Sequence, residues 1–165
     1  MYEIFYPDFK FDKVSDIPDS FFEERDIEWA LLDIDNTLVP YTMPHPDENA
    51  IAFLNRLERL GITYIFVSNN DADRVKLFCD KLGRDYKFIS KAHKPLTKKA
   101  KEALHKLGAK RENTVLIGDQ VFTDVYCGKR LGITTIMVNP LEASETPFFG
   151  FKRRMEKVVL KNYKG

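Results

Sequence analysis

Short apolar runs alternate with amphipathic stretches of about a dozen residues along most of this chain. Residues 27–34 form a near-continuous apolar run, which is typical of a strand buried on both faces, and residues 62–67, 86–89, 114–117 and 133–138 are further short strands. Strands that are joined by helical crossovers form parallel sheets. The sequence therefore predicts an α/β fold, a doubly wound and mostly parallel sheet with helices on both faces.

The amphipathic stretches predict the helices of this fold. Apolar side chains recur at helical spacing and a glycine often follows, which is a common helix stop. The expected helices span residues 47–60, 71–82, 97–107 and 123–131. We expect one domain over residues 1–165, in which 1–26 are an irregular N-terminal extension, 27–140 the core and 141–165 a basic C-terminal helix.

Two features of the composition bear on the cellular compartment. Cys79 and Cys127 are too few and too isolated for a disulfide framework or a zinc site, so we expect them to pack as small apolar groups. The N-terminus lacks the basic and apolar regions of a secretory signal, and no apolar run approaches the ~20 residues that span a bilayer. We therefore expect a cytoplasmic protein.

Polar side chains follow four of the predicted strands, at the edge where doubly wound sheets bind ligands. In chain order they are Asp33 and Asp35, then Ser68, Asn69 and Asn70, then Lys94, and finally Asp119 and Asp124. Carboxylates that converge repel one another unless a cation lies among them. Carboxylate oxygens suit Mg²⁺, which keeps water ligands that a phosphate can replace. The sequence therefore predicts a Mg²⁺ site at this edge.

These residues resemble the four motifs of the haloacid dehalogenase (HAD) superfamily of phosphotransferases. The motifs are DIDNT at 33–37, Ser68, Lys94 and GDQVFTD at 118–124, and the resemblance covers about residues 27–140. It implies a Mg²⁺-dependent phosphomonoester hydrolase that works through an aspartyl-phosphate.

The resemblance implies a role for each position. Asp33 is the expected nucleophile, and Asp35 the general acid for the leaving alcohol and then the base for the attacking water. Ser68 and Lys94 are expected to hold the transferring phosphoryl group. The expected Mg²⁺ ligands are Asp33, the main-chain carbonyl of Asp35, Asp119 and Asp124. The expected substrate site is completed by Asn36, Thr37, Asn69 and Asn70, although the last two are equally suited to capping the next helix.

The spacing of the motifs leaves no room for a cap domain. Only residues 38–48 follow the first motif before the next helix, and only residues 71–93 separate the second motif from Lys94. An open site admits a substrate whose bulk stays outside, such as a lipid head group, a nucleic-acid end or a phosphoprotein. A sugar phosphate would fit if oligomerisation supplied a lid.

A finer resemblance narrows this choice. DIDNTLV, VSNN, the Lys-Pro of the third motif and GDQ-x-x-TDV are similar to the capless subclass IIIA branch, and most similar to its YqeG-type, phosphatidylglycerophosphate phosphatase-like proteins. The resemblance implies that phosphatidylglycerophosphate is dephosphorylated to phosphatidylglycerol, and we favour this lipid over a nucleic-acid end, a phosphoprotein or a sugar phosphate.

The C-terminal stretch supports contact with an anionic surface. Its last sixteen residues carry six basic side chains and one acidic one. Apolar residues fall at helical spacing among basic ones, namely Phe151, Met155, Val158 and Val159 among Lys152, Arg153, Arg154 and Lys157. A basic amphipathic helix can lie in an anionic membrane interface, so we expect a peripheral location at the inner membrane face. The alternative is a helix that packs on the sheet with solvated lysines.

Two other protein classes share parts of this pattern. One is a receiver-type regulatory domain, which is phosphorylatable or binds Mg²⁺ but has no turnover. Such a domain would lack a second acidic residue two positions after its phosphorylated aspartate, because its phosphoryl group must persist. Asp35 occupies that position in this chain and argues against this class. A dinucleotide-binding protein would need a glycine-rich first turn, where this chain has Asp33-Ile34-Asp35.

Overall fold

The computed structural model describes residues 2–83, 85–143 and 146–165, which form a six-stranded sheet in the order β1-β6-β5-β2-β3-β4. Every neighbouring pair is parallel, which confirms the predicted fold class. The strands are β1 (Phe9–Phe11), β2 (Trp29–Leu32), β3 (Thr63–Val67), β4 (Phe88–Ile89), β5 (Thr114–Gly118) and β6 (Thr134–Val138).

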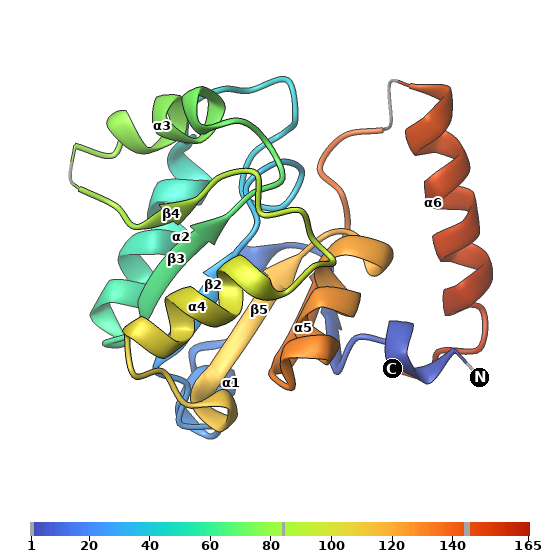
Figure 1. Cartoon of the computed structure of the whole chain (residues 1–165), viewed down its shortest axis with the longest axis horizontal. Coiled ribbons are helices and arrows are strands. Elements are labelled where there is room, and N and C mark those ends of the chain that lie inside the picture. The colour runs from blue at the N-terminus through green and yellow to red at the C-terminus, as the bar shows by residue number, and fades with distance from the viewer. Residues whose placement is uncertain (1, 84, 144–145) are drawn as a thin grey trace.

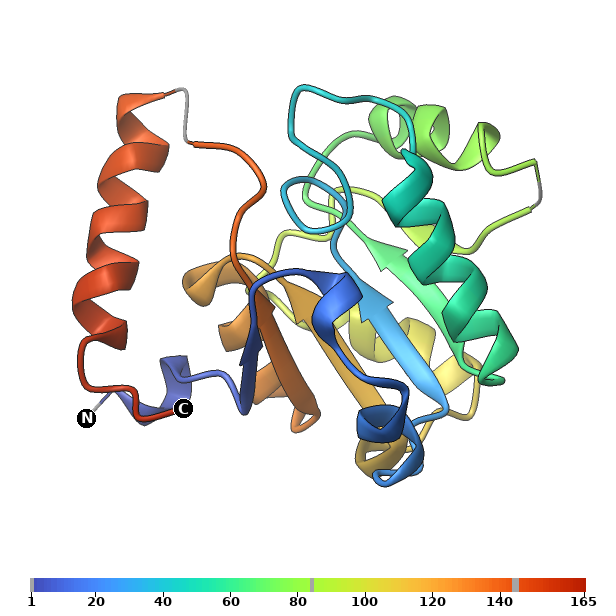
Figure 2. The ribbon, with the colours of Figure 1, turned by 180° about the vertical axis from the view of Figure 1, so that it is seen from behind.

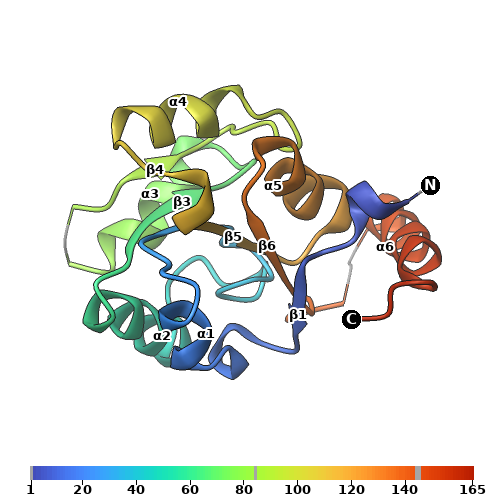
Figure 3. The ribbon, with the colours of Figure 1, turned by 90° about the horizontal axis from the view of Figure 1, so that it is seen from below.

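Helices cover both faces of the sheet (Figure 3). One face packs against α1 (Asp19–Glu23), α2 (Glu48–Arg59) and α3 (Ala72–Asp80), and the other against α4 (Lys98–Lys106) and α5 (Tyr126–Leu131). Alternation along β2 explains the two cores, since Ala30 and Leu32 belong to the first cluster and Leu31 to the second. Cys79 and Cys127 are buried free thiols, as expected.

The N-terminal segment differs from the irregular extension that we expected. Within it, β1 adds a parallel edge strand beside β6 (Figure 2), and α1 places Phe21 and Phe22 in the core. Asp8 fixes this edge, because its carboxylate accepts hydrogen bonds from the main-chain nitrogen and hydroxyl of Thr135. The edge strand is thus held by contacts with residues more than a hundred positions away.

The remaining elements of the described chain are four short helical turns and a long C-terminal helix. Short 3₁₀ helices span Glu3–Phe5 (η1), Val14–Asp16 (η2) and Arg111–Asn113 (η3), and a π-helical turn (η4, Val121–Val125) precedes α5 where a continuous helix was expected. The long helix α6 (Pro147–Leu160) stands at one edge of the molecule (Figure 1). None of the helices formed by the described residues is long and apolar enough to cross a bilayer. Only loops, α3 and β4 occupy the described parts of 38–47 and 71–93, so neither gap holds a further domain there.

Candidate active site

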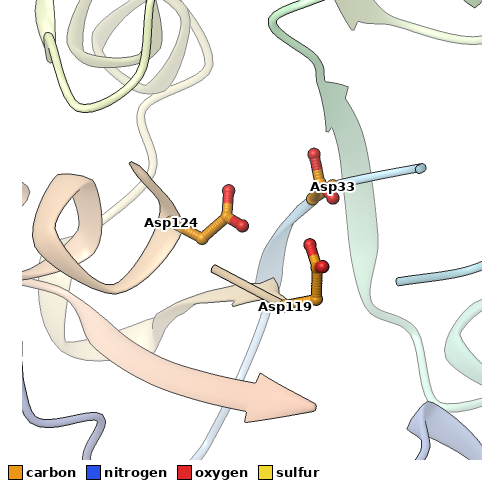
Figure 4. Close-up of side chains that lie close together, drawn as sticks. All are labelled: Asp33, Asp119 and Asp124. Carbon is orange, nitrogen blue, oxygen red and sulfur yellow. The ribbon is translucent and has the colours of Figure 1, made fainter. Parts of the chain in front are cut away.

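Three aspartates gather at the carboxyl ends of β2 and β5 (Figure 4). Asp33 follows β2, Asp119 follows β5, and Asp124 lies in η4. Each is buried and offers a carboxylate oxygen within 4.8 Å of those of the other two. Gly118 permits this close packing, because a Cβ atom there would lie 2.3 Å from the carboxyl carbon of Asp124. The cluster brings together three of the four predicted metal-binding residues.

Two cations offset the charge of this cluster. The Lys94 ammonium lies 2.7 Å from Asp33 Oδ1 and 2.6 Å from Asp124 Oδ1, and it is almost fully buried. The Arg153 guanidinium binds the carboxylate of Asp119, donates to the main-chain oxygen of Asp119 at 2.7 Å, and pairs with Glu156 at 3.0 Å. Each aspartate of the cluster therefore has a basic partner.

Burial and the neighbouring charges shift the pKa values of Asp33, Asp119 and Lys94. Burial, reinforced by the charges of Asp124 and Asp119, raises the pKa of Asp33 well above its ordinary value although Lys94 opposes the shift. Burial also raises the pKa of Asp119 to about 6, against the opposing charge of Arg153. For Lys94 burial acts to lower the pKa, but the charges of Asp124 and Asp33 outweigh it and the pKa is raised. The cluster thus carries excess negative charge that a further cation would relieve.

The turn after β2 holds the Asp33 carboxylate in place. Thr37 is buried and its hydroxyl lies 2.9 Å from Asp33 Oδ2 and 3.4 Å from Asp119 Oδ1. Asn36, in the left-handed region at φ 61°, accepts the main-chain N–H of Tyr41 on its side-chain oxygen. Their predicted contact with phosphate stays a prediction; in the structure the Thr37 hydroxyl binds Asp33, and Asn36 binds the turn and lines the pocket described below.

Asp35 lies apart from the other three aspartates. Its Oδ1 accepts from Arg74 and its Oδ2 from the side-chain nitrogen of Asn70. Arg74 also donates to the main-chain oxygens of Pro44 at 3.0 Å and Met43 at 2.9 Å, so it fixes the loop after β2. The Asp35 carboxylate is therefore positioned as a separate group and does not join the acidic cluster.

Ser68 and Asn69 occupy the end of β3, as predicted. The Ser68 hydroxyl oxygen is buried and accepts the main-chain N–H of Asn70 at 3.0 Å, which leaves its proton free to donate to a ligand. Asn69 bonds the main chain of Lys94 twice, accepting its N–H at 2.7 Å and donating to its carbonyl at 3.1 Å. Asn69 and Asn70 thus position Lys94 and Asp35, and both line the pocket described below. The N-cap of the next helix is Asp71, so neither asparagine caps it, and their contact with phosphate stays a prediction.

A cavity of about 350 Å³ opens over these groups. The catalytic candidates Asp33, Asp35, Ser68 and Lys94 line it together with residues of α6. From α6 and the segments beside it come Phe148, Phe149, Lys152, Arg153, Thr146, Glu142 and Ala143, and the remaining lining residues are Asn36, Tyr41, Asn69, Asn70, Gln120 and Thr123. No cap domain covers the site in the described part of the chain, but α6 gives it a wall that the sequence did not predict.

The orientation of α6 corrects the amphipathic pattern expected for the C-terminal helix. Val159, expected in the apolar stripe, is buried, and Arg153, expected at the surface, binds Asp119. Phe148, Phe151, Met155 and Val158 are exposed and form the outer stripe. Sequence reasoning also missed the contacts of Arg74 and Gln120 at the site, and the place of Lys152 and Arg153 in the pocket lining. Nothing in the sequence separates these residues from other polar side chains at a surface.

Comparisons with known proteins agree with this geometry. Residues 90–144 match a family model described as HAD-hydrolase-like. Over 158 residues the chain is 36% identical to the probable phosphatase YqeG of Bacillus subtilis, covering 96% of this chain and 91% of that protein. A shorter match, 34% identical over 65 residues, covers 39% of this chain and 19% of phosphatidylglycerophosphate phosphatase 1, chloroplastic/mitochondrial, of Arabidopsis thaliana. Among solved structures, a putative HAD superfamily (subfamily III A) hydrolase from Legionella pneumophila superposes with a TM-score of 0.56 at 16% identity, over 85% of this chain and 86% of that one.

Proposed function

The chain belongs to the HAD superfamily of phosphatases, and we propose that it hydrolyses phosphomonoesters through a phosphoryl group carried on Asp33. The observation that carries this proposal is one cavity that holds Asp33 and Asp35, a buried lysine bonded to Asp33, and the neighbouring acidic cluster. A carboxylate can attack a phosphate only where cations offset their mutual repulsion. Lys94 supplies one such charge beside the nucleophile.

Mg²⁺ is the proposed cofactor, and the donor set fits it. The three clustered side chains offer only oxygen ligands, which a small hard divalent ion prefers. Asp33, Asp119 and Asp124 would hold the ion together with the main-chain carbonyl of Asp35. When bound, Mg²⁺ supplies Lewis acidity and positive charge at the phosphoryl oxygens.

In this proposal the reaction proceeds through two successive displacements at phosphorus. In the first, a carboxylate oxygen of Asp33 forms a bond to phosphorus, the bond to the alcohol oxygen breaks, and protonated Asp35 gives its proton to that oxygen. In the second, Asp35 takes a proton from water, the water oxygen bonds to phosphorus, and the bond to Asp33 breaks. Inorganic phosphate and free Asp33 remain. Ser68 donates to a phosphoryl oxygen, while Arg74 and Asn70 hold Asp35 in place.

Phosphatidylglycerophosphate is the proposed substrate, at a membrane surface. The exposed stripe of α6 begins at Phe148, which also lines the cavity, so an apolar surface is continuous with the pocket mouth. Exposed Arg154 and Lys157 lie on the same helix, as a surface that meets anionic lipid requires. The match to the Arabidopsis phosphatidylglycerophosphate phosphatase supports the same class, although it covers about a fifth of that protein.

Phosphate release with Mg²⁺, compared between the native chain and Asp33→Asn, tests the proposal. The substrates are phosphatidylglycerophosphate in mixed micelles, 5′- and 3′-phosphorylated oligonucleotides, a phosphotyrosine peptide, sugar phosphates and p-nitrophenyl phosphate. We expect release from the lipid that EDTA and Asp33→Asn abolish. Release confined to another natural substrate would contradict the lipid assignment, and silence on every substrate would favour a regulatory domain without turnover.

A further inference from the structure

Three cationic side chains line the cavity, and they differ in their partners. Lys94 faces the carboxylates of Asp33 and Asp124, and Arg153 those of Asp119 and Glu156. Lys152 donates to the side-chain oxygen of Gln120, which is neutral. Within residues 2–83, 85–143 and 146–165 no carboxylate forms an ion pair with Lys152. Lys152 therefore differs from Lys94 and Arg153, because among the described residues it has no carboxylate partner.

The surroundings of Lys152 make this arrangement costly without a ligand. Its side chain is half-buried, and burial lowers its pKa although the more distant charges of Glu156 and Asp124 oppose the shift. A charge that leaves water loses hydration, and one neutral amide oxygen replaces little of it. An anion that enters the cavity would supply the missing partner.

This anion is distinct from the phosphoryl group that is transferred. The transferred group must lie against Asp33, where Lys94 is the bonded cation. Lys152 extends from α6 to the side-chain oxygen of Gln120 and bonds none of Asp33, Asp119 and Asp124 in the described part of the chain. Phe148 and Phe149, about one turn before Lys152, line the same wall and remain 71% and 40% exposed. The wall therefore combines one unmatched cation with apolar rings.

We infer that Lys152 determines specificity by binding a second anionic group of the substrate, a phosphodiester in the alcohol that leaves. The ligand class is a phosphomonoester of a glycerophosphodiester, with Phe148 and Phe149 beside its apolar part. This inference rests on the proposed function and adds the residue that selects the substrate. The same two anionic groups occur in a soluble head group and in an intact lipid, so the test includes both.

The test measures kcat/KM for native protein, Lys152→Gln and Lys152→Arg. The substrates are glycerol 3-phosphate, which has one anionic group, the deacylated head group glycerophosphoglycerophosphate, which has two, and phosphatidylglycerophosphate in mixed micelles. We expect Lys152→Gln to lower the preference for the two-anion substrates over glycerol 3-phosphate by about 10- to 100-fold, mainly through KM, since a hydrogen bond to a charged group is worth about that factor. Lys152→Arg should restore most of the preference. The matched control is Lys106→Gln, an exposed lysine of α4 outside the cavity lining, which should leave the preference unchanged.

Several outcomes would overturn the inference. An unchanged preference in Lys152→Gln, or an equal loss of kcat/KM on all three substrates, would mean that Lys152 does not bind a second anionic group of the substrate. A Lys152-dependent preference for a 5′-phosphorylated dinucleotide over the glycerol head group would replace the glycerolipid class with a nucleic-acid end. Turnover of p-nitrophenyl phosphate separates this inference from the proposed function. If native protein hydrolyses it but shows no preference for two-anion substrates, the inference fails and the phosphatase remains.

Discussion

Replacing Arg153 by Met removes the counter-charge of two buried carboxylates. The side chains of Asp119 and Glu156 are 0% and 3% exposed, and that of Arg153 is 19% exposed. Loss of one partner from a buried ion pair costs about 3–5 kcal/mol, and we expect the lower end because Arg153 keeps some contact with water. A loss of about 3 kcal/mol would lower the melting temperature of a chain of this size by about 6–12 °C.

The assay is urea unfolding followed by circular dichroism, in EDTA and again with excess MgCl₂. Arg154→Met is the control, because this exposed neighbour on α6 should change the free energy of unfolding by less than about 0.5 kcal/mol. Mg²⁺ should stabilise Arg153→Met more than the native chain, since Asp119 then lacks its directly bonded cation. A ligand at 100 times its dissociation constant adds about 2.7 kcal/mol, so the effect is measurable. A loss below about 1 kcal/mol in EDTA would refute the view that Arg153 holds Asp119 and Glu156 in the fold.

Three further results are expected. Burial raises the pKa of Asp119 to about 6 from 3.8, so without divalent ions this group lowers the stability of the fold as pH rises from about 4 to about 6. The rise in melting temperature caused by Mg²⁺ should therefore be larger at pH 7.5 than at pH 5.5. An equal rise at both pH values would contradict this pH dependence. Arg74→Gln frees Asp35 from one partner and should slow hydrolysis of an alkyl phosphate more than that of p-nitrophenyl phosphate, whose leaving group needs little protonation; equal slowing would rule out a role through Asp35. Phe151→Ser combined with Val158→Ser removes much of the exposed stripe of α6 and should reduce sedimentation with anionic vesicles at low salt by at least several-fold, whereas undiminished sedimentation would exclude this stripe as the contact.

The predicted strands and helices of the core agree with the structure to within a few residues, because their apolar pattern reflects burial on both faces of the sheet. The edge strand β1 could not be predicted in this way. It has three residues, and its pairing with β6 depends on Asp8 and Thr135, which are 127 positions apart. Local sequence carries little information about a contact of that kind.

The residues of the candidate site were also predicted only in part. Asp33, Ser68 and Asp119 follow strands directly, and Lys94 and Asp124 lie in the segments after β4 and β5, so the topology brings all five to one edge. The sequence did not identify the residues that hold them. Arg74 acts from α3 and Arg153 from α6, and in the sequence both resemble ordinary surface arginines. Their roles depend on how these helices pack, which periodicity does not determine.

The packing of α6 links the residue proposed to select the substrate to the proposed phosphoryl-transfer groups. Adjacent residues of this helix reach different parts of the cavity, since Arg153 holds Asp119 and Lys152 faces the pocket beside Gln120. Asp119 and Gln120 are themselves consecutive in the chain, so the helix contacts the site through two neighbouring pairs. A shift of α6 would therefore move the proposed second-anion contact and a proposed metal ligand together. Because the opposite side of α6 is exposed and apolar, a membrane that binds there would act on KM and kcat at once.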